Sequence, residues 1–165
     1  MEQLLGPSDI TQLLEQLASQ LIEKENVHLI GIRSRGDVVA ARLADILNLS
    51  APGILDISLY RDDFSHRRES PKLQSTDIPF EVDGAHIILV DDVLFTGRTI
   101  RAALDAIHDY GRPASVQLAV LVDRGHRELP IQANFVGHKV ETSRADHVRV
   151  DLTAGSESVT LTKHS

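Results

Sequence analysis

Apolar residues recur along the chain in two kinds of pattern, which together predict helices and strands in alternation. Three sets repeat at helical spacing, and each defines one buried helix face: Ile10, Leu13, Leu14, Leu17, Ala18 and Leu21; Val39, Leu43, Ile46 and Leu47; Ile100, Ala103, Leu104 and Ile107. Compact apolar runs typical of buried strands cover residues 27–32, 54–60, 87–90 and 116–122. This alternation predicts parallel βαβ units in an open, twisted, mostly parallel sheet flanked by helices, so we expect an α/β fold.

The ends of several elements carry signals of their own. Ser8, which follows Pro7, is placed to cap the first helix, and Gly111 is placed to end a helix over residues 98–110. Near the C-terminus the period of the pattern changes to two, which predicts a terminal hairpin or a small strand cluster. The alternating residues there are Val148, Val150 and Leu152, followed by Val159 and Leu161.

A long polar stretch over residues 61–79 interrupts the regular pattern. It is rich in charged residues and has little periodicity. A loop of this length inside a compact domain is usually functional or disordered. On the residues alone, a mobile lid over a binding site and a tolerated insertion are equally supported.

Composition narrows the class of protein. The chain has 165 residues, no cysteine and a formal charge of −7, which fits one globular domain and excludes disulfides, cysteine zinc sites and thiol nucleophiles. The N-terminus lacks a basic region followed by an apolar run, and the apolar runs are too short to cross a membrane. We therefore expect a soluble cytoplasmic protein. The acidic balance argues against a general nucleic-acid coat but leaves room for a local basic patch.

The chemistry is concentrated where the strand over residues 87–90 runs into Asp91 and Asp92. The turn over residues 96–99 has the sequence Thr-Gly-Arg-Thr and opens the third helix. Its glycine lets the backbone approach a ligand, and N–H groups at a helix N-terminus attract an anion such as phosphate. Two carboxylates beside a phosphate are favourable if they accept hydrogen bonds from sugar hydroxyls, or if a divalent cation lies between. The motif therefore predicts a phosphorylated sugar with Mg²⁺ at the carboxyl end of a parallel strand. An ordinary turn with two solvated aspartates is the alternative, which the rarity of this combination disfavours.

Three segments resemble the PyrR family, whose members are uracil phosphoribosyltransferases of the type I fold that also regulate pyrimidine genes. They cover residues 54–63, 93–98 and 118–131. The stretch over residues 87–99, with the paired acids and the turn, resembles the PRPP-binding signature of type I phosphoribosyltransferases in general. The similarity keeps the same order and spacing from about residue 29 to residue 150.

This resemblance implies a reaction and a domain plan. Uracil and PRPP would be converted to UMP and pyrophosphate. Residues 1–165 would form one phosphoribosyltransferase domain, with a lid over about 61–79 and a C-terminal hood over about 123–165. The family also implies a homodimer or a higher homo-oligomer, which composition alone does not indicate.

The resemblance further assigns roles to individual residues. Asp91 and Asp92 would be the catalytic pair that contacts the ribose hydroxyls, with Mg²⁺ held mainly by PRPP near them. The residues matched to the 5′-phosphate loop are Val93, Leu94, Phe95, Thr96, Gly97, Arg98 and Thr99. Those matched to pyrophosphate binding are Ser34, Arg35, Gly36 and Arg61, and those matched to the base pocket are Arg124 and Val148. From the residues alone, an arginine-glycine turn and a strand valine are more often structural.

An RNA-binding attenuator with weak or no catalysis is the alternative from a different class. Such a protein would bind pyrimidine-operon mRNA through basic residues, and the first helix has few of them. Over residues 8–25, Lys24 stands against four acidic residues, a net charge of −3. Glu15, Gln16 and Ser19 occupy positions where RNA-binding relatives would carry basic residues. We therefore expect a mainly enzymatic role. The remaining alternatives are a phosphoribosyltransferase for another base and an inactive sensor that binds UMP or PRPP.

Basic residues are more frequent later in the chain. Two groups stand out: Arg124 and Arg127, then Lys139, Arg144 and Arg149. Acidic residues lie among both groups, so we interpret each as a mixed solvated surface rather than an RNA site.

Overall fold

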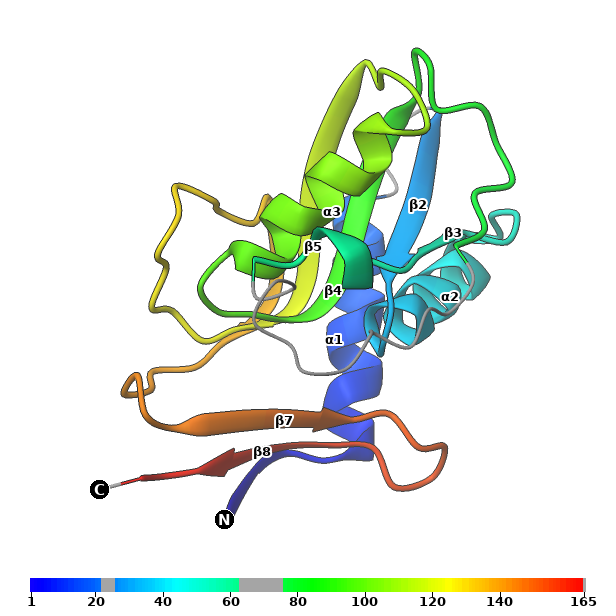
Figure 1. Cartoon of the computed structure of the whole chain (residues 1–165). Helices are drawn as coiled ribbons and strands as arrows, with labels where there is room; N and C mark the ends of the chain where they lie inside the picture. The colour runs from blue at the N-terminus through cyan, green and yellow to red at the C-terminus, as the bar shows by residue number, and fades with distance from the viewer. Residues whose placement is uncertain (22–25, 63–75, 165) are drawn as a thin grey trace.

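A five-stranded parallel sheet forms the body of the protein in the computed structural model, which describes residues 1–21, 26–62 and 76–164 (Figure 1). Every neighbouring pair in the sheet is parallel, which confirms the predicted α/β class. In spatial order the strands are β3 (Gly53–Leu55), β2 (Val27–Ile32), β4 (His86–Leu94), β5 (Ser115–Asp123) and β6 (Phe135–Lys139).

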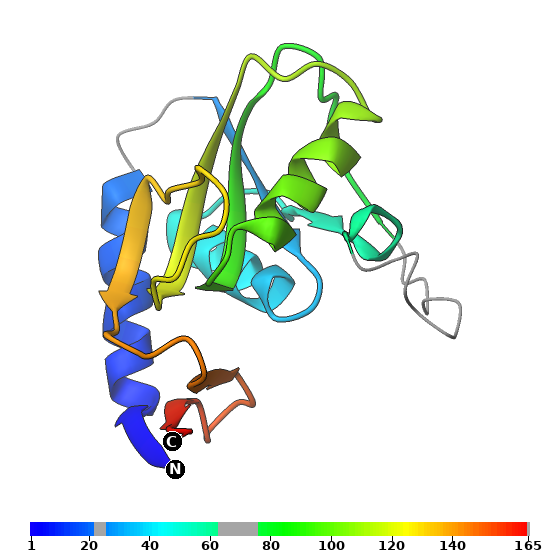
Figure 2. The same ribbon diagram turned by 60° about the vertical axis from the view of Figure 1, so that its left-hand side comes forward.

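Helices cover both faces of this sheet (Figure 2). The residues that alternate along β4 show the division: Ile88 and Val90 pack with one set of helices, and Leu89 packs on the other side. A strand buried on both faces reads as an unbroken apolar run, as residues 87–90 do. The first face carries α1 (Pro7–Leu21) and α2 (Gly36–Leu47), and the second carries α3 (Arg98–His108).

A small antiparallel sheet brings the two ends of the chain together. Its order is β1-β8-β7, with β1 (Glu2–Leu5), β7 (His147–Asp151) and β8 (Ser158–Thr162). The β7–β8 hairpin confirms the strand cluster predicted near the C-terminus. Val148, Val150 and other inward residues of this sheet pack against the cluster that α1 and α2 form. The small sheet therefore belongs to the same hydrophobic core as α1, α2 and one face of the main sheet.

Two helix ends differ from the prediction. The first helix begins at Pro7, so Ser8 lies inside the helix and the predicted serine cap is wrong. Proline is favoured at a first helical position, and Asp9 reaches back to accept the Gly6 N–H at 2.9 Å. The third helix ends at His108 rather than residue 110.

Gly111 has a structural role other than that of a helix stop. A Cβ built on it would lie 2.7 Å from Asp83 Oδ1, and its φ is +150°. Asp83 also accepts the Arg112 N–H at 2.7 Å. The glycine therefore allows the chain after α3 to pass close to the loop before β4.

The predicted strand over residues 54–60 is wrong for most of its length. Only Gly53–Leu55 forms a strand, and Ser58–Tyr60 forms a 3-10 turn, η1. The side chain of Asp56 causes this change, because its Oδ1 accepts the Ser58 N–H at 2.9 Å and the Ser58 hydroxyl at 2.6 Å. The predicted buried face of α2 also needs correction at Ile46, which is 43% exposed.

Some predictions fall on residues outside the described parts. Of the predicted lid over 61–79, residues 63–75 lie outside them, as do Glu23, Lys24 and Glu25 of the acidic first-helix segment. Within the described ranges, no helix is both long enough and apolar enough to cross a bilayer.

Candidate functional site

The two acids that were predicted to follow a strand lie within strand β4 itself. Strand β4 continues past residue 90 to Leu94, because the backbone of Asp91 and Val93 still pairs with β5. The Asp91 and Asp92 side chains are buried, with only 5% and 8% of each residue exposed. Both lie near the carboxyl end of a parallel strand flanked by β2 and β5, which is the edge where such sheets bind ligands.

The loop between β2 and α2 meets this acidic pair. Arg35 Nε donates to Asp92 Oδ2 at 2.9 Å. Gly36 lies so close to β4 that an added Cβ would be 2.7 Å from the Val90 carbonyl oxygen and 3.0 Å from Asp91 Cα. The predicted pyrophosphate loop, which includes Ser34, and the predicted sugar-binding acids are therefore neighbours.

The charged form of Asp91 is electrostatically unfavourable in its buried position. Burial raises the pKa of Asp91 well above its usual range, and the neighbouring Asp92 carboxylate raises that pKa further. The Asp92 N–H donates to Asp91 Oδ1 at 2.9 Å, which offsets only part of this effect. Donors or a cation brought by a ligand would favour the charged form of Asp91.

The Thr-Gly-Arg-Thr turn lies between β4 and α3, as predicted. Gly97 precedes the helix with φ +91°, a conformation that glycine adopts at little cost. The Thr96 hydroxyl accepts the Arg98 N–H at 3.2 Å. Beside this turn is a cavity of about 250 Å³, which we call the turn pocket; its lining residues are Arg61, Asp62, Thr96, Arg98 and Thr99. Arg61, which the resemblance assigned to pyrophosphate binding, thus lines the same pocket as residues of the turn although it lies 35 positions before Thr96 in the sequence.

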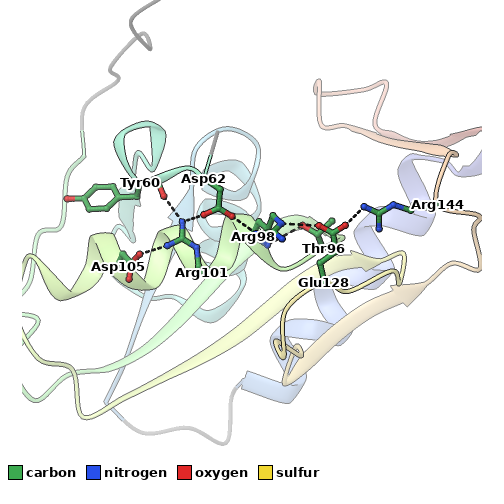
Figure 3. A network of polar contacts seen from close by, with 8 residues as sticks. All are labelled: Tyr60, Asp62, Thr96, Arg98, Arg101, Asp105, Glu128 and Arg144. Carbon is green, nitrogen blue, oxygen red and sulfur yellow. Dashed lines mark hydrogen bonds and ion pairs between the residues drawn. The ribbon is translucent and has the colours of Figure 1, made fainter. Parts of the chain in front are cut away.

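The side chain of Arg98 extends between two carboxylates (Figure 3). Its Nη1 donates to Asp62 Oδ2 at 2.7 Å, and its Nε donates to Glu128 Oε1 at 2.9 Å. A guanidinium paired twice in this way attracts a phosphate less strongly than a lone one. The Arg98 N–H is bonded to Thr96, so the N–H groups that follow it in the first helical turn are the part of this segment that could attract an anion.

The residues just before the turn divide between the core and the loop that follows β5. Leu94 is buried in the cluster beneath α3, whereas Val93 packs on the opposite cluster. The Phe95 ring lies under Arg124, whose guanidinium carbon is 3.9 Å from the ring centroid. These three residues therefore support the turn rather than line the turn pocket.

Arg124 is buried and is held by backbone carbonyls. Its Nη1 donates to the Asp146 carbonyl at 2.7 Å, and its Nη2 donates to the Ser143 carbonyl at 3.0 Å. Arg124 is only 5% exposed, and this burial lowers the pKa of its guanidinium. Val148 follows two residues after Asp146 in β7, and its side chain packs in the core with 8% exposed. Arg124 thus ties the end of β5 to the segment that leads to Val148.

Two further residues organise the site without having been predicted. Arg127 donates to the Phe95 carbonyl and to the Ile131 carbonyl, both at 2.9 Å, and pairs with Asp123 at 2.6 Å. The four-residue spacing of Asp123 and Arg127 is a signal that sequence reasoning could have used. The other residue is Asp62, whose partner Arg98 lies 36 positions away, so no local spacing indicates it.

Comparison with known proteins identifies the family. The phosphoribosyl transferase domain family matches residues 2–153. The chain is 50% identical over 160 residues to the bifunctional protein PyrR of Roseiflexus sp. (strain RS-1), covering 92% of this chain and 87% of the relative. It belongs to the PyrR family. The PyrR protein of Chloroflexus aurantiacus is 49% identical over 175 residues, which cover 99% of this chain and 96% of the relative. A phosphoribosyltransferase domain therefore spans most of the chain.

Solved structures share the fold at low sequence identity. A hypoxanthine-guanine phosphoribosyltransferase of Bacillus anthracis superimposes with a TM-score of 0.69 at 20% identity, covering 86% of this chain and 84% of that chain. A purine phosphoribosyltransferase of Pyrococcus horikoshii gives a TM-score of 0.64 at 21% identity, covering 81% and 85%. The predicted type I phosphoribosyltransferase fold of this PyrR-family protein is confirmed.

Proposed function

We propose that this protein transfers the phosphoribosyl group of PRPP to uracil and releases UMP and pyrophosphate. The observation that carries the proposal is the buried pair Asp91 and Asp92, which meets Arg35 from one loop and precedes the Thr-Gly-Arg-Thr turn. PRPP has a ribose, a pyrophosphate and a 5′-phosphate to be bound, and the acidic pair, Arg35 and the turn are suited to these three parts in that order. The PyrR-family membership supports the same substrates. In this proposal the chain works as one domain.

The two carboxylates bind the sugar. Asp91 and Asp92 accept hydrogen bonds from the ribose hydroxyls, in addition to those that they already accept from Arg35 Nε and from the N–H groups of Asp92 and Val93. The turn over residues 96–99 binds the 5′-phosphate through the N–H groups at the start of α3, with the Thr96 and Thr99 hydroxyls beside them. The sugar is thereby held at both ends before the reaction.

In this proposal the pyrophosphate end is reached by Arg35, which contacts Asp92, and by Arg61 from the turn pocket. Ser34 and Gly36 complete the loop that binds it, since Gly36 allows the loop to approach β4. In the reaction, N1 of uracil forms a bond to C1′ while the bond from C1′ to the pyrophosphate oxygen breaks. The electron pair leaves with pyrophosphate, and the N1 proton is lost to solvent or to the leaving group. Arg35 and Arg61 stabilise the charge that develops on the leaving group.

Mg²⁺ fits this site as an ion carried largely by the substrate. The chain offers the oxygen ligands that Mg²⁺ prefers in Asp91 and Asp92, at the edge where PRPP would lie. Among the described residues, no group of three or more histidine or acidic side chains forms a complete metal cage. PRPP would therefore supply most of the ligands. When bound, the ion neutralises charge on the pyrophosphate.

The base is placed by the loop that follows β5 and by β7. Arg124 supports this pocket, because its guanidinium holds the carbonyls of the segment before Val148. The backbone of Val148 faces the base in this proposal. Uracil is favoured over a purine by the family, whereas the side chains in this region do not by themselves select a base.

A pyrophosphate-release assay with PRPP, Mg²⁺ and a panel of bases tests this proposal. Uracil should be turned over, and hypoxanthine, guanine and orotate should give no more than background. Turnover of hypoxanthine without turnover of uracil would contradict the assignment of the base while leaving the phosphoribosyltransferase chemistry intact.

Binding of pyrimidine-operon mRNA is the second candidate function, favoured by the word "bifunctional" in the relatives' name. The exposed face of α1, with Glu15, Gln16 and Ser19, offers no basic residue to such a partner within the helix as described. Arg124 and Arg127 are occupied by internal carbonyls. We therefore propose that any RNA contacts come from exposed basic residues, such as Lys139, Arg144 and Arg149.

Labelled leader RNA tests this second function. Binding should be weak and should respond little to salt, because α1 as described has no basic residue and because Arg124 and Arg127 are bonded to internal carbonyls. Tight binding with a steep loss between 50 and 200 mM salt would instead establish a regulatory role. The expected homodimer or higher homo-oligomer stays a prediction, which sedimentation would test.

A further inference from the structure

A chain of alternating charges runs beside the turn pocket (Figure 3). We call it the rim network; its members are Asp105, Arg101, Asp62, Arg98, Glu128 and Arg144. Asp62 is at its centre. One Asp62 carboxylate oxygen pairs with Arg98 Nη1 at 2.7 Å, and the other pairs with Arg101 Nη2. The network thereby joins the segment after η1 to α3, and α3 to the loops that carry Glu128 and Arg144.

The same network holds the backbone on both sides of Arg61. Arg101 Nη2 pairs with Asp62 and also donates to the Tyr60 carbonyl at 2.8 Å. One guanidinium on α3 therefore anchors the residue before Arg61 and the residue after it. Arg61 and Asp62 both line the turn pocket. Arg61 at this pocket thus lies between two residues that Arg101 contacts.

Stability is a poor explanation for this arrangement. The side chains of Asp62, Arg98 and Arg101 are 35–48% exposed, and exposed ion pairs contribute little to folding. Direct attraction of an anionic ligand by the charges of the network is an equally poor explanation. Three arginines face three acids along the network, so its own charges cancel. Its effect on an anionic ligand must come from where it holds a neighbouring group.

We propose that Asp62 is a positioning residue for PRPP, which acts by holding Arg61 at the turn pocket through Arg98 and Arg101. This rests on the proposed function, because it takes PRPP as the anionic ligand. Asp62 itself touches no reacting atom. Its carboxylate is needed as a two-sided acceptor, and an amide at this position would lose both the charge and one of the two acceptor oxygens.

The test compares Asp62→Asn with a matched control, Asp105→Asn. Asp105 pairs at 2.6 Å with Arg101, one of the two arginines that Asp62 contacts, but it lies further along α3 and does not line the turn pocket. Titration calorimetry with PRPP and Mg²⁺ measures binding, and steady-state kinetics separate the KM for PRPP from kcat. Asp62→Asn should weaken PRPP binding about five- to tenfold with kcat changed less than about twofold, and Asp105→Asn should change binding less than about twofold. Asp62→Glu, which keeps both acceptors, should recover part of the loss.

A double-mutant cycle decides whether Asp62 acts through Arg61. In an Arg61→Ala background, Asp62→Asn should weaken PRPP binding by less than about twofold, since the group that it positions is already gone. Multiplicative losses would overturn the proposal, and so would wild-type affinity in Asp62→Asn. If the wild-type protein itself bound no PRPP, the proposed function would fail as well. Wild-type binding with an unaffected Asp62→Asn variant would overturn only the role of Asp62.

Discussion

Gly36 lies directly against Asp91. A Cβ built on Gly36 would come within 3.0 Å of Asp91 Cα and within 2.7 Å of the Val90 carbonyl oxygen. These are backbone atoms, so no side-chain rotation relieves the contact. The loop over residues 33–36 and the acidic pair therefore meet at a spacing that glycine permits and any side chain disturbs.

Substitution Gly36→Ala tests this contact. The loop must move away from β4, which should lower the free energy of unfolding by about 1–3 kcal/mol. It should also raise the KM for PRPP, because the loop carries Arg35. Gly6→Ala is a suitable control, since its added Cβ would meet only side-chain atoms, at 3.3 Å and 3.8 Å. Urea unfolding and steady-state kinetics measure both effects, and a Gly36→Ala variant that matches the control would contradict the close approach.

Substitution Asp91→Asn should stabilise the protein without ligand, in a pH-dependent manner. Burial raises the folded-state pKa of Asp91 above its ordinary 3.8, so the native state loses stability as pH rises through that raised pKa. The variant has no such loss. It should exceed wild type by at least about 1 kcal/mol at pH 8 and by little at pH 3. Urea unfolding across this pH range is the measurement.

Asp151→Asn is the control for that pH series, because its expected effect on the free energy of unfolding has the opposite sign. Hydrogen bonds from Thr153 lower the pKa of Asp151, so its contribution is present above pH 3.8 and lost as pH falls through the lowered pKa. Its removal should therefore destabilise the protein at neutral pH. A stability difference for Asp91→Asn that did not change with pH would argue against a buried, destabilised carboxylate.

Much of the fold could be predicted because its signals are local. The helix faces, the buried strands and the terminal hairpin each follow from spacing within a few residues, and the structure confirms them in outline. Two strands escaped prediction for a physical reason. Strand β1 pairs with β8, more than 150 positions away, and β6 is a half-buried edge strand whose Phe135, Val136 and Gly137 show no clear alternation. Neither strand carries a pattern that can be read without its partner.

The residues of the candidate site also fall into those that the sequence indicates and those that only the structure shows. Asp91, Asp92 and the turn stand out because strand, acids and glycine are contiguous in sequence. The burial of Arg124 and the contacts of Asp62 depend on segments that meet only in three dimensions. Sequence reasoning could name Arg124 by resemblance, but it could not show that the guanidinium is occupied by carbonyls of residues 143–146.

Substitution Arg124→Met should therefore affect folding and base binding together. It leaves the Asp146 and Ser143 carbonyls without their donors and should cost about 2 kcal/mol of unfolding free energy. The KM for uracil should rise more than the KM for PRPP, because the displaced segment leads to Val148. Arg149→Met, at an exposed position in β7, should stay within about 0.5 kcal/mol of wild type. Equal changes in both KM values would show that Arg124 has no particular link to the base.

The most direct test of the account follows labelled uracil into UMP in the presence of PRPP and Mg²⁺. The wild-type protein should form UMP only when PRPP is present. The Asp91→Asn, Asp92→Asn double variant should fold, as circular dichroism and unfolding would show, and should lose at least about 100-fold in kcat/KM because the sugar is no longer held. UMP formation at the wild-type rate by this folded double variant would contradict the central claim that the buried acidic pair binds the ribose.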